Sequence, residues 1–183
     1  LHRKRRQTTR IPTISLVGYT NAGKSTLLNI LTASDVLAED KLFATLDPTT
    51  RNIPLPDGSE ALLTDTVGFI QKRPHHLIAA FRATLEEVIQ ADVLLHVIDV
   101  SHPQYKEQSQ AVFQVLRELN ADTKHLITVF NKADKIEDQE FLTQLLQQEN
   151  SIAISARSGA GIPELLKLIE NFLKLQTVEI RLL

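Results

Sequence analysis

A stretch near the start of the chain has the residue types and the spacing that bind polyphosphates. It follows an apolar run, residues 14–17, precedes a helical pattern that begins at Thr26, and fits GxxxxGK[ST] as Gly18-Tyr19-Thr20-Asn21-Ala22-Gly23-Lys24-Ser25. A glycine-rich turn from a strand into a helix directs several backbone N–H groups, and the positive end of the helix dipole, at one point. In such a loop Lys24 reaches the β- and γ-phosphates of a nucleotide, and the Ser25 hydroxyl is a ligand of Mg²⁺. We therefore predict a nucleotide-phosphate site from Gly18 to Thr26.

A second motif, Asp65-Thr66-Val67-Gly68, matches DxxG about forty residues later, at the end of a predicted strand over 61–64. A carboxylate at Asp65 can hold a water of the Mg²⁺ shell. Because Gly68 has no Cβ, its N–H can approach the γ-phosphate closely. DxxG alone is a weak signal, but its position after a phosphate loop makes it good evidence.

Two further motifs follow predicted strands in the second half of the chain and indicate guanine. Asn131-Lys132-Ala133-Asp134 matches NKxD after a strand pattern that ends at Phe130. The Asp134 carboxylate can accept two N–H bonds from guanine N1 and its 2-amino group, whereas adenine presents an acceptor there. We expect Asn131 to tie this loop to the phosphate loop and the Lys132 stem to cover the base. After a short strand over 152–154, Ser155-Ala156-Arg157 matches the element whose alanine N–H meets guanine O6.

The alternation of strand and helix patterns predicts an α/β fold with right-handed crossovers. Strands are predicted at 14–17, 52–55, 61–64, 93–98, 125–130 and 152–154, and further helices at 77–90, 104–119, 141–148 and 162–173. The turn Pro56-Asp57-Gly58-Ser59 makes 52–55 and 61–64 a hairpin. We therefore expect a six-stranded, mostly parallel sheet with one antiparallel edge strand and helices on both faces. His96, on a nearly continuous apolar strand, is expected to be a hydrogen-bonded core residue rather than a ligand.

The composition is that of an ordinary globular domain, with 43% hydrophobic residues, 23% charged residues and a formal net charge of −2. It carries no overall signal for nucleic acid or membrane. The chain has no Cys, which excludes disulfides and thiolate metal sites. No apolar run reaches the roughly 18 residues of a membrane span, so we expect a cytoplasmic, soluble protein. A monomer is a separate expectation. Because the chain has no Met and begins at Leu1, we also expect a fragment of a longer protein.

Taken in order, these motifs resemble the Ras-like P-loop GTPase superfamily over residues 12–174. The resemblance narrows to the G domain of the HflX family through four strings: Gly18 to Leu27, Leu42-Phe43-Ala44-Thr45-Leu46-Asp47-Pro48-Thr49-Thr50-Arg51, Asp65 to Ile70, and Ala83-Thr84-Leu85-Glu86-Glu87. It implies a GTP-binding and GTP-hydrolysing switch, with Mg²⁺ as cofactor. It also implies a factor that binds the large ribosomal subunit and its rRNA and separates stalled or hibernating ribosomes.

The resemblance also assigns roles to individual residues. Thr50, with Thr49 as the alternate, matches the threonine whose hydroxyl completes the Mg²⁺ shell and senses the γ-phosphate. Lys24, Thr50 and Gly68 are therefore the expected catalytic residues, and Asp65 is expected to hold the metal through a water.

Two residues bear on the rate of hydrolysis. Phe69 stands where Ras-like enzymes carry a water-orienting Gln, so hydrolysis should be slow unless a partner or an ion supplies the missing stabilisation. Phe69 can equally anchor its loop on apolar surface. Asn21 resembles the Asn that ligates K⁺ in GxxNxGK loops. Stimulation by K⁺ is therefore a hypothesis, with an ordinary loop-stabilising Asn as its alternative.

The two ends of the chain have patterns of their own. Residues 1–11 form a basic segment with Arg3, Lys4, Arg5, Arg6 and Arg10, which resembles the end of a preceding helical region and suits either RNA contact or a solvated tail. In 175–183, Val178, Ile180 and Leu182 alternate with charged residues, which predicts a strand in a tail or at the start of a further domain.

Two other functions stay open. One is a GTPase of ribosome assembly or tRNA modification, which shares the Asn21 loop. The other is a guanine-nucleotide-dependent binding module with negligible hydrolysis in isolation, which Phe69 makes conceivable.

Overall fold

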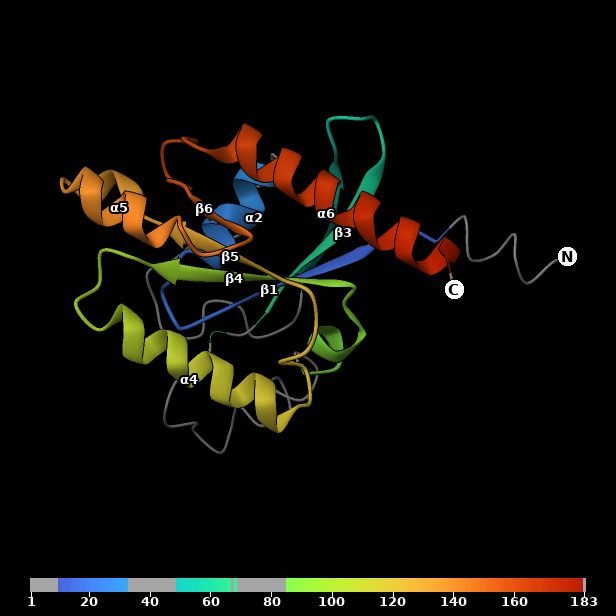
Figure 1. Ribbon diagram of the computed structural model, residues 1–183, viewed down its shortest axis with the longest axis horizontal. Helices are drawn as coiled ribbons and strands as arrows, with labels where there is room; N and C mark the ends of the chain where they lie inside the picture. Colours follow the sequence, from blue (N-terminus) through green and yellow to red (C-terminus); the bar gives the residue numbers. More distant parts are fainter. Residues whose placement is uncertain (1–9, 33–48, 67, 69–84, 183) are drawn as a thin grey trace, which may run out of the picture.

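One six-stranded sheet forms the centre of the molecule (Figure 1). The structure, a computed structural model, describes residues 10–32, 49–66, 68 and 85–182. The strand order is β2-β3-β1-β4-β5-β6, with β1 at Thr13–Gly18, β2 at Thr49–Pro54, β3 at Glu60–Asp65, β4 at Val93–Asp99, β5 at Leu126–Asn131 and β6 at Ser151–Ala153. The edge strand β2 pairs antiparallel with β3, and all other neighbours are parallel. The predicted sheet, with its single antiparallel edge, is confirmed.

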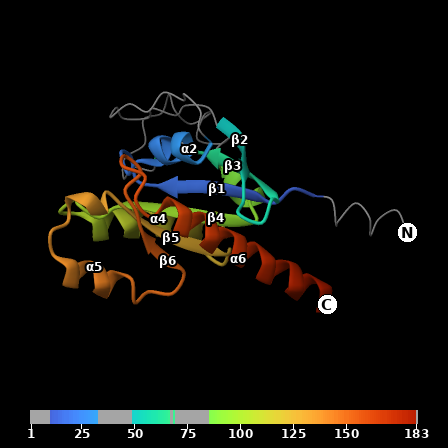
Figure 2. The same cartoon turned by 90° about the horizontal axis from the view of Figure 1, so that it is seen from above.

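Helices cover both faces of this sheet (Figures 1 and 2). Helices α2 (Lys24–Thr32) and α6 (Ile162–Leu182) lie on one face, and α4 (Tyr105–Glu118) lies on the other together with a helical segment over 85–90. Helix α5 (Gln139–Leu145) lies beyond the end of β5, after the short 3₁₀ turn η2 (Ala133–Lys135). Helices α2, α4 and α6 each bury one apolar stripe against the sheet.

Side-chain alternation along the central strands explains why the two cores are separate. In β4, Val93, Leu95 and Val97 face α2 and α6, whereas Leu94 faces α4. Both sets are fully buried, which accounts for the nearly continuous apolar run. The α2–α6 core contains Leu27, Leu28, Leu31, Leu165, Ile169 and Leu173 from the helices, and the α4 core contains Val112, Val115 and Leu116.

The strand expected near the C-terminal end is wrong, whereas the assignment of this end to a tail or to a further domain stays a prediction. Residues 175–182 continue α6, which runs without a break from Ile162 to Leu182, so no strand forms there. Alternation over only three apolar residues is weak evidence, and a helix that is already nucleated adds one hydrogen bond for each further residue. In this last part of the helix, Leu175, Val178 and Leu182 are exposed, in contrast to the buried Leu173.

Other sequence predictions differ from the structure by a few residues or fall outside it. Helix α2 begins at Lys24 rather than Thr26, and α5 begins at Gln139 rather than Phe141. The basic residues before Arg10, the string 42–48, Phe69 and the first part of the 77–90 helix lie outside the described residues.

Candidate functional site

The phosphate loop is shaped by close backbone contacts at the carboxyl end of β1. A Cβ at Gly18 would lie 2.5 Å from the Val97 carbonyl oxygen, and one at Gly23 would collide with the Asn131 side-chain nitrogen. Gly23 also has a φ of +101°, and Asn21 has a φ of 65°. Glycine is therefore required at 18 and 23 for space, and at 23 for backbone conformation as well.

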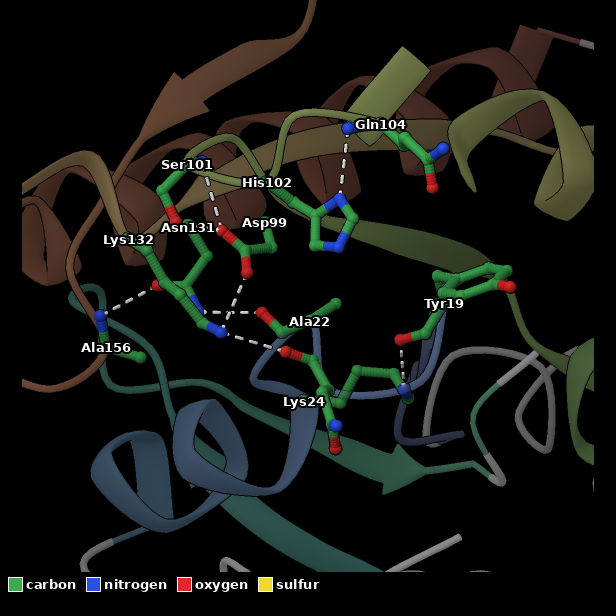
Figure 3. A network of polar contacts seen from close by, with 11 residues as sticks. Tyr19, Ala22, Lys24, Asp99, Ser101, His102, Gln104, Asn131, Lys132 and Ala156 are labelled. Atoms are coloured by element: carbon green, nitrogen blue, oxygen red, sulfur yellow. Dashed lines mark hydrogen bonds and ion pairs between the residues drawn. The ribbon is translucent and has the colours of Figure 1, made fainter. Parts of the chain in front are cut away.

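Lys24 is a buried cation with weak partners. Its Nζ donates to the carbonyl oxygens of Gly18, at 3.4 Å, and Tyr19, at 3.3 Å, so the side chain curls back over its own loop (Figure 3). Desolvation lowers the pKa of this ammonium, and the nearby Asp65 carboxylate opposes that shift. The printed hydrogen bonds of this buried ammonium go to neutral carbonyl oxygens and are long, so the site favours the arrival of an anion.

The DxxG motif meets this loop, as the sequence predicted. The Ser25 hydroxyl donates to Asp65 Oδ2 at 2.6 Å, and Asp65 is fully buried. A Cβ at Gly68 would lie 2.9 Å from both Cα and Oγ1 of Thr20 and 3.3 Å from Lys24 Nζ. Lys24, Ser25, Asp65 and Gly68 therefore converge at one edge of the sheet.

The residues at this edge fit Mg²⁺. Ser25 and Asp65 present a hydroxyl and a carboxylate, the hard oxygen ligands that Mg²⁺ prefers, and Mg²⁺ sites commonly use one or two protein ligands with phosphates and waters. The described residues contain no group of three or more His, Cys, Asp or Glu side chains that could hold a metal.

Asn131 connects three loops, which confirms the expectation that it ties its loop to the phosphate loop. Its Nδ2 donates to the Ala22 carbonyl oxygen at 2.9 Å, and its Oδ1 accepts from the Ala156 N–H at 3.0 Å (Figure 3). The residue is buried, so both bonds are protected from water. In this arrangement the Ala156 N–H is engaged by Asn131, and its contact with guanine O6 stays a prediction.

Lys132 has partners that the sequence reasoning missed. Its Nζ donates to the Asn21 carbonyl oxygen at 3.0 Å and pairs with Asp99 Oδ2 at 2.9 Å (Figure 3). Asp99 Oδ1 accepts from the Ser101 N–H at 3.0 Å and from its hydroxyl at 2.5 Å. Burial raises the pKa of the Asp99 carboxyl, but the bonds from Ser101 and Lys132 outweigh it and the net pKa is lowered.

One signal in the sequence marks Asp99. It directly follows the apolar run 93–98. In the structure it pairs in register with Asn131, the first residue of NKxD, at the same edge of the sheet. A carboxylate that follows an apolar strand beside a lysine-bearing loop is a candidate ion-pair partner.

The remaining guanine-motif residues lie on the turns that follow β5 and β6. Asp134 is exposed in η2, and Arg157 is exposed as well. Ser155 is buried, and its hydroxyl oxygen accepts from the Ser158 N–H at 3.2 Å, which makes it a support for its turn.

Thr50 lies away from the other expected metal ligands. Its hydroxyl hydrogen-bonds that of Thr64 at 2.9 Å, whereas the residue in register with Asp65 is Thr49. Because side chains alternate along a strand, Thr50 and Asp65 belong to opposite faces of the sheet. The choice between Thr49 and Thr50 stays a prediction, and the register favours Thr49.

The family of the chain can be identified from its sequence. Residues 13–132 match the family model described as the 50S ribosome-binding GTPase. The chain belongs to this GTPase family. The matched range contains the phosphate loop, DxxG, and the Asn131 and Lys132 of NKxD.

Curated relatives of this GTPase domain carry the description GTPase HflX. The chain is similar to GTPase HflX of Lacrimispora saccharolytica, with 53% identity over 96% of this chain and 41% of the relative. GTPase HflX of Escherichia coli is 51% identical over 85% of this chain and 37% of the relative. The chain therefore spans about two-fifths of the length of the curated relatives it matches.

Solved structures of similar fold are GTP-binding proteins. One is a GTP-binding protein from Sulfolobus solfataricus in complex with GDP, with a TM-score of 0.73 and 29% identity over 96% of this chain and 56% of that one. Another is Era in complex with MgGDPNP and a segment of 16S ribosomal RNA, with a TM-score of 0.72 and 28% identity over 87% of this chain and 56% of that one. Across the described part of the chain, no helix has the length and apolarity needed to span a membrane.

Proposed function

We propose that this chain is a switch domain that binds GTP and Mg²⁺ and hydrolyses GTP to GDP and phosphate. The observation that carries the proposal is the convergence of the Lys24 ammonium, the Ser25–Asp65 pair and Gly68 at the phosphate loop. Each of these groups corresponds to a group that phosphoryl-transfer enzymes use. In such enzymes catalysis consists mainly of positioning the reactants and neutralising charge.

The chain's own residues divide the work of binding the triphosphate. Backbone N–H groups of residues 21–26 cradle the phosphates, and Lys24 leaves its two long carbonyl contacts to pair with the β- and γ-phosphates. Ser25 and Asp65 would hold Mg²⁺, Asp65 through a water, with Thr50 or Thr49 completing the shell. Once bound, the metal neutralises phosphate charge. Loss of the γ-phosphate would release the contacts of Gly68 and of that threonine, which is the basis of a switch.

Base selection is assigned to Asp134, with Lys132 and Ala156 around the base. The exposed Asp134 carboxylate is free to accept the two guanine N–H groups, each bond to a charged acceptor contributing about 1.5–3 kcal/mol. Asn131 and Lys132 hold the base loop against the carbonyl oxygens of Ala22 and Asn21.

We further propose that Asn21 binds a potassium ion and that this ion accelerates GTP hydrolysis. Asn21 has a left-handed backbone conformation, and Lys132 holds its carbonyl oxygen, so the side chain projects from a fixed point of the loop. A cation there would add positive charge where the transition state is most negative. Equal turnover in K⁺ and Na⁺ would remove this proposal.

For the whole protein we propose action on the large ribosomal subunit and its rRNA, in the cytoplasm. The family description and the relatives described as GTPase HflX support this role, and Era is a structural neighbour solved with ribosomal RNA. Capture of large subunits in the GTP state, compared with capture of tRNA, separates this role from a function in tRNA modification.

A titration with GTP, GDP and ATP tests nucleotide recognition first. We expect Asp134→Asn to weaken GTP binding by roughly a hundredfold, from the loss of two bonds to a charged acceptor, and to improve binding of xanthine nucleotides. Unchanged GTP affinity would remove Asp134 from the base site. Phosphate release over many turnovers, with and without large subunits, then separates an enzyme from a binding module, which would release none.

A further inference from the structure

Thr20, in the middle of the phosphate loop, has a buried hydroxyl with no hydrogen-bond partner among the described residues. The residue is only 9% exposed. A buried hydroxyl that makes no bond costs roughly 1–3 kcal/mol, so most such groups in folded proteins are satisfied. A valine would fill the same space without that cost. The presence of a hydroxyl at this position therefore needs an explanation.

The surroundings of this oxygen supply that reason. A Cβ at Gly68 would lie 2.9 Å from Thr20 Oγ1 and 3.3 Å from Lys24 Nζ. The orphaned hydroxyl, the ammonium and the DxxG glycine therefore meet at one point. Under the proposed function, that point is where the γ-phosphate and the attacking water lie, because the lysine and the glycine N–H both contact the γ-phosphate.

We propose that Thr20 is a catalytic residue of GTP hydrolysis. Its hydroxyl oxygen accepts a hydrogen bond from the attacking water, and its own hydrogen is donated to a γ-phosphate oxygen. The inference rests on the proposed function and adds to it a group that orients the nucleophile. The sequence has Phe69 where a water-orienting glutamine is expected, and an apolar ring has no lone pair for this task.

The step itself is a displacement at phosphorus. The water oxygen forms a bond to the γ-phosphorus while the bond to the β–γ bridging oxygen breaks, and the bond electrons leave with GDP. The water proton ends on the released phosphate. Thr20 stays neutral throughout, because its hydroxyl positions the water without taking its proton, and its oxygen can both accept and donate.

Single-turnover hydrolysis by the chain, together with its affinity for GDP, tests the proposal. Thr20→Val removes the hydroxyl and keeps the shape. We expect its hydrolysis rate constant to fall at least about tenfold, while its GDP affinity stays within roughly twofold of the original, since GDP has no γ-phosphate. Thr20→Ser restores the hydroxyl, and we expect its rate constant to recover to within about threefold. Thr177→Val, an exposed threonine on α6, is the matched control for the substitution itself.

A second test measures binding and so does not depend on the slow hydrolysis of GTP. GDP with aluminium fluoride mimics the transferring phosphoryl group, so Thr20→Val should weaken this complex about as much as it slows hydrolysis. The proposal is overturned if Thr20→Val hydrolyses GTP at the original rate. It is also overturned if Thr20→Val loses GDP affinity in the same proportion as rate, or if Thr20→Ser is as slow as Thr20→Val. A parent chain that binds GTP but never hydrolyses it, with or without large subunits, would overturn this inference and the proposed hydrolysis together.

Discussion

At the scale of single residues, the nucleotide loops are held by a few polar side chains that are buried or partly buried. Asn131 bonds to Ala22 and Ala156, and Lys132 bonds to Asn21 and Asp99. Each bond joins residues that are far apart in the sequence, so each fixes the position of one loop relative to another. Asp99 has no direct place in the proposed nucleotide contacts, and it acts by holding the Lys132 ammonium.

We therefore predict that Asp99→Asn accelerates GDP release by roughly tenfold. The amide can still accept from Ser101 through its oxygen, but its NH₂ group then faces the Lys132 ammonium, and two donors repel each other. Stopped-flow release of a fluorescent GDP analogue measures the effect.

Asp92→Asn is the control for this prediction. Asp92 lies directly before the start of β4, whereas Asp99 ends that strand, and the Asp92 carboxylate accepts a hydrogen bond from the Thr13 N–H at 2.8 Å. We expect this control to change stability but not release. Equal release rates in the two variants would show that Asp99 supports the fold and not the nucleotide. In a Lys132→Gln background, Asp99→Asn should have little further effect.

At the scale of elements, the two halves of α6 differ in what they pack against. Its first half buries Leu165, Ile169 and Leu173 on the sheet. On the side of the β2–β3 hairpin, Lys174 Nζ lies 3.5 Å from both Asp57 Oδ2 and Glu170 Oε1. The hydrogen bond from Lys167 lowers the pKa of Glu170, and burial, which raises this pKa, only partly offsets that effect. The second half continues beyond these contacts, and Leu175, Val178 and Leu182 in it are exposed.

Two alanine substitutions on this one helix should therefore differ in effect. Ile169→Ala removes a fully buried side chain from the α2–α6 core, and we expect it to lower the free energy of unfolding by about 2–5 kcal/mol. Leu175→Ala changes a side chain that is 67% exposed, and we expect an effect within about 0.5 kcal/mol. Urea unfolding of both variants measures the difference. Similar losses would mean that the exposed half of α6 packs on other parts of the molecule.

At the scale of the whole molecule, folding buries His96 in the interior, on the face of β4 that carries α4. Its ring contacts the Phe113 ring edge-to-face, with centroids 5.2 Å apart. It is a core residue, as expected, and its Nδ1 has no hydrogen-bond partner among the described residues. Burial, and then the charge of Lys24, lowers the pKa of His96 to about 3.

The stability of the domain should therefore fall on acidification. The unfolded chain takes a proton at His96 below the ordinary pKa of 6.5, whereas the folded chain does so only near the lowered pKa of about 3. Between these values the unfolded state binds more protons, so the free energy of unfolding decreases by up to about 1.4 kcal/mol for each pH unit lost.

His96→Leu tests this pH dependence, because leucine fills a similar space without a titratable group. Urea unfolding between pH 7 and roughly pH 5 should give a shallower decline for the variant than for the parent chain. Parallel declines would show that other groups cause the loss of stability in acid.

Much of the fold and of the site was predictable because it depends on local sequence. The phosphate loop, DxxG and NKxD are contiguous motifs, and each follows an apolar strand whose carboxyl end places it at the same edge of a parallel sheet. The hairpin turn at Asp57 and Gly58 could be predicted for the same reason, since turn type depends on adjacent residues.

Sequence alone determined the motifs, the order of strands and helices, and the class of ligand. Tertiary structure alone decided that Lys132 pairs with Asp99, that Thr50 faces Thr64, that the Thr20 hydroxyl is buried beside Gly68, and that α6 continues to Leu182. These contacts join residues separated by many positions, and they depend on the register of strands and on which atoms the folded chain leaves unpaired. Spacing along a chain carries local backbone geometry, but it does not carry the distances that packing creates between distant segments.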